Sequence, residues 1–300
     1  MRIRVLGASG GIGNGARTTA LLVDDDVLID AGTGVADLSL DAMAAIDHVF
    51  LTHAHLDHVT CIPFLLDSVA SRRTRPLVVH AQEATLAVLR AHLFNNALWP
   101  DFTAIPSRDK PYLRFELLTP GESVALDGRS LRSIPVSHSI PAVGYLLGNG
   151  RASLAFSGDT SSTDAFWQVL NACADLRHVI IETSFTDDDE PLSRLSGHLC
   201  PRMLVQELAK KGGYRIVTSD MMPLPESIRG LAAEHVQGDL VYKIKTFYDY
   251  DFDIIFHLAA SLSSKAEIAT EEAHRINVEG TMQLLMLAAY RSEKYNKAVK

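Results

Sequence analysis

The feature that most constrains this chain is a dense run of histidine and aspartate at residues 53–58, His-Ala-His-Leu-Asp-His, directly after an apolar stretch. Side chains two positions apart on an extended segment share a face, so His53 and His55 can point at one ion. Asp57 and His58 can turn toward a second ion where the chain enters a helix. Imidazole and carboxylate are ligands that zinc takes, and an incomplete ligand set leaves room for a reactive water. A histidine-rich polar loop is the alternative, but this spacing after a strand favours a metal site.

The pattern at residues 53–58 resembles the His-x-His-x-Asp-His signature of the metallo-β-lactamase-fold hydrolases. The leucine before the aspartate makes it similar to the class II cyclic-nucleotide phosphodiesterases and, more distantly, to the tRNA 3′-processing endonucleases of the RNase Z group. The resemblance covers residues 1–212. It implies an α/β fold, the four-layer αββα sandwich of that family, and a hydrolase that uses divalent metal ions.

Four more candidate residues follow in the order in which the family has them. His138 comes after an expected strand, and Asp159 comes after an apolar run and a glycine turn. Glu182 lies within another apolar run, which predicts a buried strand over residues 179–185, and His198 lies in a Ser-Gly-His run. Taken alone, each could be structural, as a surface histidine, a helix N-cap or a polar loop residue. Their order as a set favours a shared site.

The resemblance also implies what each residue does. One ion would be held by His53, His55 and His138 and the other by Asp57 and His58, with Asp159 bridging the two. His198 would protonate the departing oxygen, with Glu182 as its partner. The implied catalytic residues are therefore Asp57, Glu182 and His198. The cofactors would be two divalent metal ions, zinc first and manganese as the alternative.

The implied reaction is hydrolysis of a phosphodiester, in first place conversion of cyclic AMP to 5′-AMP by a metal-activated hydroxide. The run 92–102, which mixes aromatic and amide residues around a proline, is expected to face the substrate. The RNase Z group cuts RNA ends with the same ligands, but it uses an additional substrate-gripping arm for which the sequence shows no insertion. Lactams and thioesters are further substrates of this fold.

The sequence departs from the family at the last expected metal ligand. The family normally ends with a strand that carries one more histidine, and Ser219 stands at that position. Asp220 would point to the opposite face of such a strand, so it is a poor replacement. We therefore expect weak binding of the second ion, and a catalytically weakened or purely binding protein is one alternative function.

Residues 213–300 resemble an incomplete extended short-chain dehydrogenase or epimerase. The resemblance lies in the runs 216–220, 235–240, 253–260 and 277–281. In that family Asp220 would hold a ribose and Asp239 an adenine edge, but no glycine-rich strand-to-helix unit precedes them to bind the pyrophosphate. Tyr290 and Lys294 have the spacing of the family's catalytic pair, which we interpret as accidental. The expectation is a partial Rossmann-like α/β segment, with an NAD(P)-linked epimerase as the alternative function.

A glycine-rich run at residues 7–13 invites a dinucleotide-binding interpretation, which we reject. That fingerprint requires a helix directly after the glycines. The segments 18–22 and 27–29, which flank three consecutive aspartates, predict a β-hairpin instead.

Composition and charge limit the partners that this chain can have. It has 28 Lys and Arg against 36 Asp and Glu, a net charge of −8 without basic clusters, so a nucleic-acid-binding surface is not expected. Cys61, Cys173 and Cys200 form no paired spacing, which fits a reducing, cytoplasmic setting. The apolar runs are too short for a signal peptide or a membrane span. The expected partner is a small cyclic nucleotide, and the sequence leaves a homodimer open.

Overall fold

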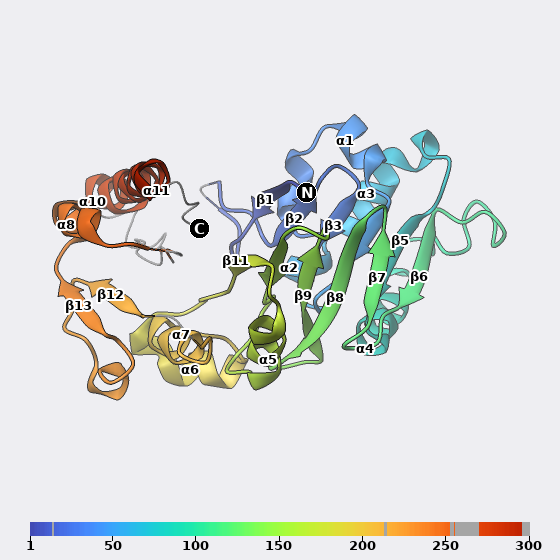
Figure 1. Cartoon of the computed structure of the whole chain (residues 1–300). Coiled ribbons are helices and arrows are strands. Elements are labelled where there is room, and N and C mark those ends of the chain that lie inside the picture. Colours follow the sequence, from blue (N-terminus) through green and yellow to red (C-terminus); the bar gives the residue numbers. More distant parts are fainter. Residues whose placement is uncertain (14, 213–214, 253–254, 256–269, 296–300) are drawn as a thin grey trace. The chain divides into compact units, whose positions relative to one another are not determined.

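The computed structural model describes residues 1–13, 15–212, 215–252, 255 and 270–295 (Figure 1). Contacts divide the chain into two compact units, one of Met1–Ser184 with Pro191–Leu199 and one of Phe185–Glu190 with Cys200–Lys300. The long C-terminal segment of the second unit begins at Cys200, whereas the sequence resemblance to the hydrolases extends to residue 212. The domain boundary at residue 212 stays a prediction.

The first unit contains a six-stranded sheet in the order β1-β2-β3-β4-β5-β6. Its strands are β1 (Ile3–Gly7), β2 (Ala20–Val23), β3 (Val27–Ile29), β4 (His48–Phe50), β5 (Leu77–Ala81) and β6 (Leu113–Leu117). β2 and β3 are the predicted antiparallel hairpin, and no helix separates β1 from β2 in the described part of that connection. β3 to β6 are parallel, so their carboxyl ends meet at one edge of the sheet.

The first unit also contains a five-stranded sheet in the order β11-β10-β9-β8-β7. Its strands are β7 (Ser123–Leu126), β8 (Arg129–Val136), β9 (Ala142–Gly148), β10 (Ser153–Phe156) and β11 (Leu176–Ile180). The buried strand predicted over residues 179–185 is wrong in both bounds and burial. β11 begins at Leu176, ends before Glu182 and is only half-buried, because it lies at an edge of the sheet with one neighbouring strand, β10.

Helices and short helical turns connect these strands. The α-helices are α1 (Leu40–Ala45), α2 (Leu56–Val59), α3 (Cys61–Val69), α4 (Glu83–Val88), α5 (Asp164–Ala172) and α6 (Glu190–Ser196). The shorter turns of this unit are η1 (Thr33–Asp37), η2 (Ala70–Arg72) and η3 (Leu89–Leu93), whereas η4 (Asp187–Asp189) belongs to the second unit. Thr163 is the N-cap residue of α5.

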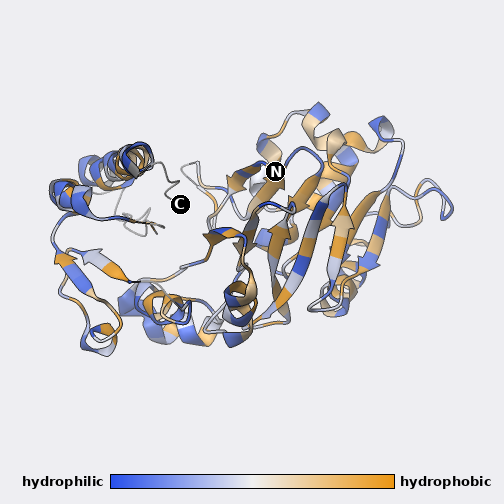
Figure 2. Ribbon diagram, viewed as in Figure 1, coloured by the Kyte–Doolittle hydropathy of each residue, from blue (hydrophilic) through white to orange (hydrophobic). Residues whose placement is uncertain are grey.

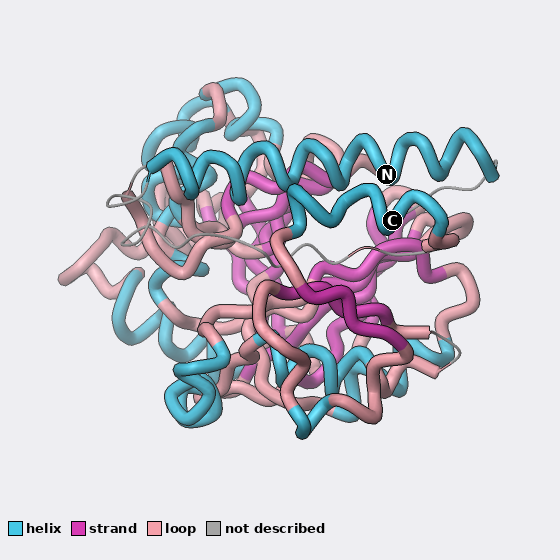
Figure 3. The backbone as a smooth tube through the Cα atoms, turned by 90° about the vertical axis from the view of Figure 1, so that its left-hand side faces the viewer, coloured by secondary structure: helices cyan, strands magenta, loops and turns pink. Residues whose placement is uncertain are grey.

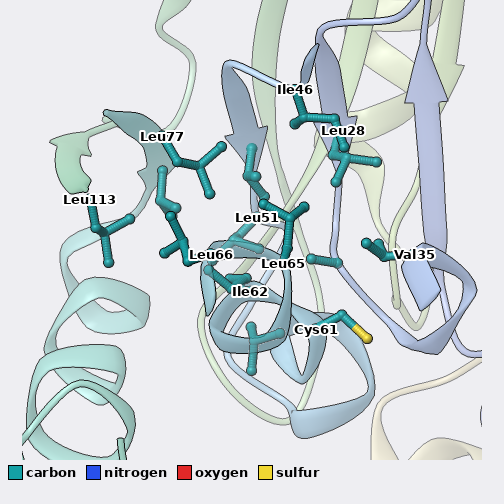
Figure 4. Packing of buried hydrophobic residues seen from close by; sticks show 14 of the residues in the cluster. Leu28, Val35, Ile46, Leu51, Cys61, Ile62, Leu65, Leu66, Leu77 and Leu113 are labelled. Atoms are coloured by element: carbon teal, nitrogen blue, oxygen red, sulfur yellow. The ribbon is translucent and has the colours of Figure 1, made fainter. Parts of the chain in front are cut away.

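Two hydrophobic clusters define the layers of the first unit. One lies between the sheets and includes Leu21, Val23, Ile29 and Phe50 from the first sheet with Leu131, Val143, Tyr145 and Phe156 from the second. The other packs the helices onto the first sheet and includes Leu28, Leu51, Ile62, Leu65, Leu66 and Leu77 (Figure 4). α5 packs on β8 of the second sheet. The observed layers are those of the predicted αββα sandwich.

β2 and β3 show why the sequence produces these layers. Every residue of both strands is buried, since one face meets the helices and the other meets the second sheet. Strands buried on both faces carry continuous rather than alternating apolar residues. Figure 2 shows the strands of this unit mostly in the apolar colour. Removing one such buried leucine side chain costs about 2–5 kcal/mol, so these strands rigidly support the loops at their ends.

The second unit contains a two-stranded parallel sheet, a small core and several helices. Its elements are α7 (Pro201–Leu208), β12 (Val217–Asp220), η5 (Glu226–Ile228), β13 (Glu234–Gln237), α8 (Leu240–Lys243), η6 (Ile244–Asp249), α10 (Thr270–His274), η7 (Arg275–Gly280) and α11 (Thr281–Tyr295). The last three follow one another as one long helical run (Figure 3). Ile244, Phe247 and Leu287 form the buried core of this unit.

Two parallel strands do not establish a Rossmann-like segment, so that expectation stays a prediction. The run 253–260, on which this resemblance partly rests, lies outside the described residues except for Ile255. In the described part of the chain, no helix combines the length and the apolar character that a membrane span requires.

Candidate metal centre

Three histidines converge beyond the carboxyl end of β4. β4 ends at Phe50, and His55, whose backbone is extended (φ −64°, ψ 148°), is the N-cap residue of α2, so the predicted entry into a helix is confirmed. Nε2 of His53 lies 3.0 Å from Nδ1 of His55, and that nitrogen lies 3.1 Å from Nε2 of His138. A tetrahedral zinc with bonds of about 2.0–2.1 Å separates its ligand nitrogens by about 3.3 Å. The three nitrogens therefore fit one such ion.

A second group of donors lies beside the first. Nε2 of His58 is 3.3 Å from Asp159 Oδ2 and 3.5 Å from Asp57 Oδ2, yet it is buried and lacks an aligned hydrogen bond. Asp159 Oδ2 is also 3.8 Å from Nε2 of His53, so Asp159 lies between the two groups. A buried imidazole nitrogen that has no hydrogen bond and faces carboxylates is typical of a metal ligand.

The fold family implies divalent metal ions, and the donor groups fit them. The groups of three donors found among the described residues are His53 with His55 and His138, His53 with His58 and Asp159, and His138 with Asp159 and His198. All of these residues lie in the first unit. Ser219 and Asp220 lie on successive positions of β12 in the second unit, so the expected weakness of the second ion stays a prediction.

Asp30 and Thr52 orient the histidines from behind. Asp30 accepts hydrogen bonds of 2.8 Å from the Thr52 amide, from the Thr52 hydroxyl and from Nδ1 of His58. The Thr52 hydroxyl lies 2.9 Å from Nδ1 of His53. With Nδ1 engaged, Nε2 of each ring is the nitrogen that faces the pocket.

Asp30 belongs to the site although the sequence interpretation did not include it among the site residues. The available signal was an acidic residue directly after the wholly apolar strand β3, and Asp30 is 0% exposed. A buried carboxylate of this kind requires several hydrogen-bond donors, which residues 52–58, the metal loop, supply. Which donors these are depends on the pairing of β3 with β4, which local sequence does not reveal.

His138 is oriented by Gly197, the residue that precedes His198 in the chain. Its Nδ1 donates to the Gly197 carbonyl at 2.9 Å, which leaves Nε2 toward His55. Gly197 has a left-handed backbone (φ +77°), and a Cβ there would lie 2.7 Å from the backbone nitrogen of Ser139. Glycine is therefore required next to His198, a constraint that the sequence interpretation missed.

The charges in the pocket stabilise a cation between the carboxylates. Burial alone would lower the pKa of His58, but the charge of Asp30 and the nearby carboxylates of Asp159 and Asp57 outweigh it and raise the pKa to about 12. Burial would raise the pKa of Asp159, but the contacts with His58 and the charges of nearby histidines hold it well below its usual range. Burial and the charge of His58 lower the pKa of His53 to about 2, so this ring is neutral at ordinary pH, the form in which imidazole can bind a metal.

Glu182 and His198 form a hydrogen-bonded pair at the edge of the metal pocket. Nδ1 of His198 lies 2.8 Å from Oε1 of Glu182 and 4.0 Å from Oδ2 of Asp159. Burial would lower the pKa of His198, but the bond and charge of Glu182, with the charges of Asp159 and Asp57, raise it above its usual value. The structure thus brings all eight predicted site residues into one region, while their roles stay predictions.

The run at residues 92–102 is accounted for by local structure. Phe94 and Phe102 are buried in the core under the first sheet. The Asn95 side chain accepts from the amides of Ala97 and Leu98, and the Asn96 side chain accepts from the amide of Asp101. The amide side chains therefore hold the backbone of their own loop, and these contacts do not support a substrate-facing role.

The acidic residues singled out in the second unit also have local partners. Asp220 accepts from the amide of Met222, and Asp239 caps α8 through the amide of Val241 and pairs with Arg275. These contacts explain both carboxylates without a nucleotide. The epimerase interpretation stays a prediction.

Comparison with known proteins places the chain in a family. Residues 25–219 match the beta-lactamase superfamily domain, so the chain belongs to the β-lactamase superfamily and has the metallo-β-lactamase fold. It is 27% identical over 281 residues to a probable 3′,5′-cyclic-nucleotide phosphodiesterase of Yersinia pestis, with 80% of each chain covered. It is 35% identical over 104 residues to a ribonuclease Z of Methanococcus maripaludis, which covers 34% of this chain and 31% of the relative.

A solved structure agrees on the fold. The crystal structure of unliganded yeast PDE1 superposes with a TM-score of 0.59 at 20% identity, covering 71% of this chain and 84% of that chain. The chain is thus homologous, at modest identity, to both cyclic-nucleotide phosphodiesterases and ribonuclease Z. The predicted resemblance to the metallo-β-lactamase-fold hydrolases is confirmed.

Proposed function

We propose that this chain hydrolyses phosphodiesters with bound divalent metal ions, and that 3′,5′-cyclic nucleotides, cyclic AMP first, are its substrates. The observation that carries the proposal is the convergence of three histidine nitrogens beside a carboxylate shared with a second donor group. The similarity to a phosphodiesterase over 80% of both chains supports this substrate class. A small-molecule substrate and a cytoplasmic location belong to the same proposal.

The ligand sets follow from the two donor groups. One ion would be held by His53, His55 and His138 and the other by Asp57 and His58, with Asp159 shared. Zinc suits this mixture of imidazole and carboxylate, and manganese is the alternative. When bound, such ions supply Lewis acidity toward phosphoryl oxygens and lower the pKa of a water molecule.

His198 is the proposed general acid. Its Nδ1 is committed to Glu182, so proton exchange with a substrate takes place at Nε2. Its raised pKa keeps more of the ring protonated near neutral pH. As the hydroxyl of a water molecule joins phosphorus, the other water proton passes to solvent and the bond from phosphorus to the 3′ oxygen breaks. The Nε2 proton passes to the 3′ oxygen, so the ring opens to a 5′-monophosphate that carries a free 3′-hydroxyl. Glu182 is then a positioning residue that holds the ring and stabilises its charge.

Cleavage of RNA ends is the second candidate, because the chain is 35% identical to a ribonuclease Z over 104 residues. The net charge of −8 disfavours a long polyanionic substrate, since nucleic-acid binding depends on many phosphate contacts from Lys and Arg. The eight residues of the site also include no basic side chain other than histidine. A small phosphodiester makes fewer demands on the surrounding surface.

One experiment separates these candidates. The purified full chain is assayed against cyclic AMP, cyclic GMP, bis(p-nitrophenyl) phosphate and a 3′-extended tRNA precursor, with metals quantified in the same sample. We expect hydrolysis of the cyclic nucleotides with close to two ions per chain. Cleavage of the tRNA precursor alone would support the ribonuclease, and two bound ions without any hydrolysis would contradict both.

A further inference from the structure

Ser184 lies in the loop after β11 and contacts both members of the proton-donating pair. Its Oγ is 2.9 Å from Oε2 of Glu182 and 3.2 Å from Nδ1 of His198. We propose that Ser184 is a positioning residue whose hydroxyl holds Glu182 and His198 in the arrangement that delivers a proton to the leaving group. This inference rests on the proposed function and adds a residue to it.

The hydrogen bonds of Glu182 show what Ser184 contributes. Oε1 accepts from the amide of Thr160, which adjoins Asp159, and from Nδ1 of His198, both at 2.8 Å. Oε2 accepts from the Ser184 hydroxyl at 2.9 Å and from the amide of Leu199 at the longer distance of 3.3 Å. Without the hydroxyl, Oε2 keeps the longer bond. Because the terminal torsion of a carboxylate has broad minima, the group can then rotate away from the ring.

The exposure of Ser184 separates this role from a packing role. Ser184 is exposed, whereas the Glu182 side chain is only 10% exposed. Replacing an exposed serine by alanine opens no cavity, so the free energy of unfolding should change by less than about 0.5 kcal/mol. An effect on activity would therefore report on the pair that the hydroxyl touches.

The test compares substrates that differ in their need for a proton. Cyclic AMP expels an alkoxide, which a general acid must protonate, whereas bis(p-nitrophenyl) phosphate expels a stable phenolate that leaves without one. For Ser184→Ala in the full chain, we expect kcat on cyclic AMP to fall about tenfold or more with little change in KM. We expect kcat on the aryl ester to change by less than about twofold. Ser184→Thr keeps the hydroxyl and should restore the rate.

The matched control is Ser196→Ala. Ser196 lies close to His198 in sequence, but its hydroxyl donates to the carbonyls of Leu192 and Ser193 within its own helical segment. We expect this variant to match the unmodified chain on both substrates. Equal losses of Ser184→Ala on both substrates, or no loss on either, would overturn the inference while leaving the proposed function intact.

A second measurement does not depend on turnover. In NMR spectra of protein with nitrogen-15-labelled histidine, the Nδ1 proton of His198 should be visible in the unmodified chain and in Ser184→Thr, and broadened by exchange with water in Ser184→Ala. His198→Gln assigns the signal. An unchanged signal in Ser184→Ala would refute the positioning role, whether or not the chain hydrolyses phosphodiesters. The absence of phosphodiester hydrolysis would separately refute the proposed function.

Discussion

The two donor groups of the metal centre differ in how complete they are. The first has three ring nitrogens separated by 3.0 and 3.1 Å, and its buried His53 is neutral because its pKa is lowered to about 2. The second relies on one imidazole, His58, and on carboxylates 3.3 and 3.5 Å away. The first group can hold an ion by itself, whereas the second depends on charge.

The largest expected effect comes from removing the carboxylate that belongs to the second group alone. Asp57→Ala should reduce hydrolysis of cyclic AMP below detection and lower the metal content by one ion, because His58 and Asp159 alone make a poor site. Metal analysis and the cyclic AMP assay measure both. His92→Ala, which removes an exposed histidine of η3, is the control. Full activity with one ion would show that the first group is sufficient.

Removing the proposed acid should affect chemistry but not metal binding. His198→Ala should lower kcat on cyclic AMP by about 10²- to 10⁴-fold while two ions remain bound, since general acid catalysis contributes that much. The same assays with metal analysis distinguish this variant from Asp57→Ala. A full rate in His198→Ala would show that the general acid is another group.

A histidine pair outside the metal groups gives a smaller effect on stability. His80 stacks on Phe50, its Nε2 is 3.0 Å from Nδ1 of His48, and burial with the charge of His48 lowers its pKa to about 4. Its unfolded pKa is near 6.5, so the unfolded chain binds more protons between these values and stability falls as pH falls. Between pH 7 and 5 this residue should cost about 2 kcal/mol of unfolding free energy.

Urea unfolding at the two pH values measures that cost. His80→Leu removes the titrating ring while keeping an apolar side chain, so its stability should decline less between pH 7 and 5 than that of the unmodified chain. An equal decline in both proteins would show that other groups account for the pH dependence.

The smallest expected effect is a difference in affinity between the two ions. A weak chelator added stepwise should remove one ion at about tenfold lower concentration than the other, because the second group has a single imidazole where the first has three. Metal content after each step is the measurement, and hydrolysis should cease with the first ion lost. Simultaneous loss of both ions would show that the two groups bind with equal strength.

Local sequence was sufficient to predict the secondary structure around the metal loop. The spacing of His53, His55, Asp57 and His58 after an apolar strand predicted an extended segment entering a helix, and both elements are present. The hairpin of segments 18–22 and 27–29 was predicted in the same way, from apolar runs that flank a turn, and β2 and β3 form it. The predicted strand near Glu182 failed because edge strands are only half-buried.

The sequence by itself determined which metal-binding and acid-base side chains the site has. It also determined which neighbouring side chains lie on the same face of a strand or helix. Only the tertiary structure decided that Asp30 supports His58, that Gly197 orients His138, and that Ser184 reaches the pair of Glu182 and His198. Apart from the contact of Ser184 with Glu182, two residues away, these contacts join separate segments of the chain, and they depend on which strands pair, in which register, and on how the two sheets stack. A slip of one residue in a strand turns every side chain to the other face, so such contacts exist only once the whole sandwich has formed.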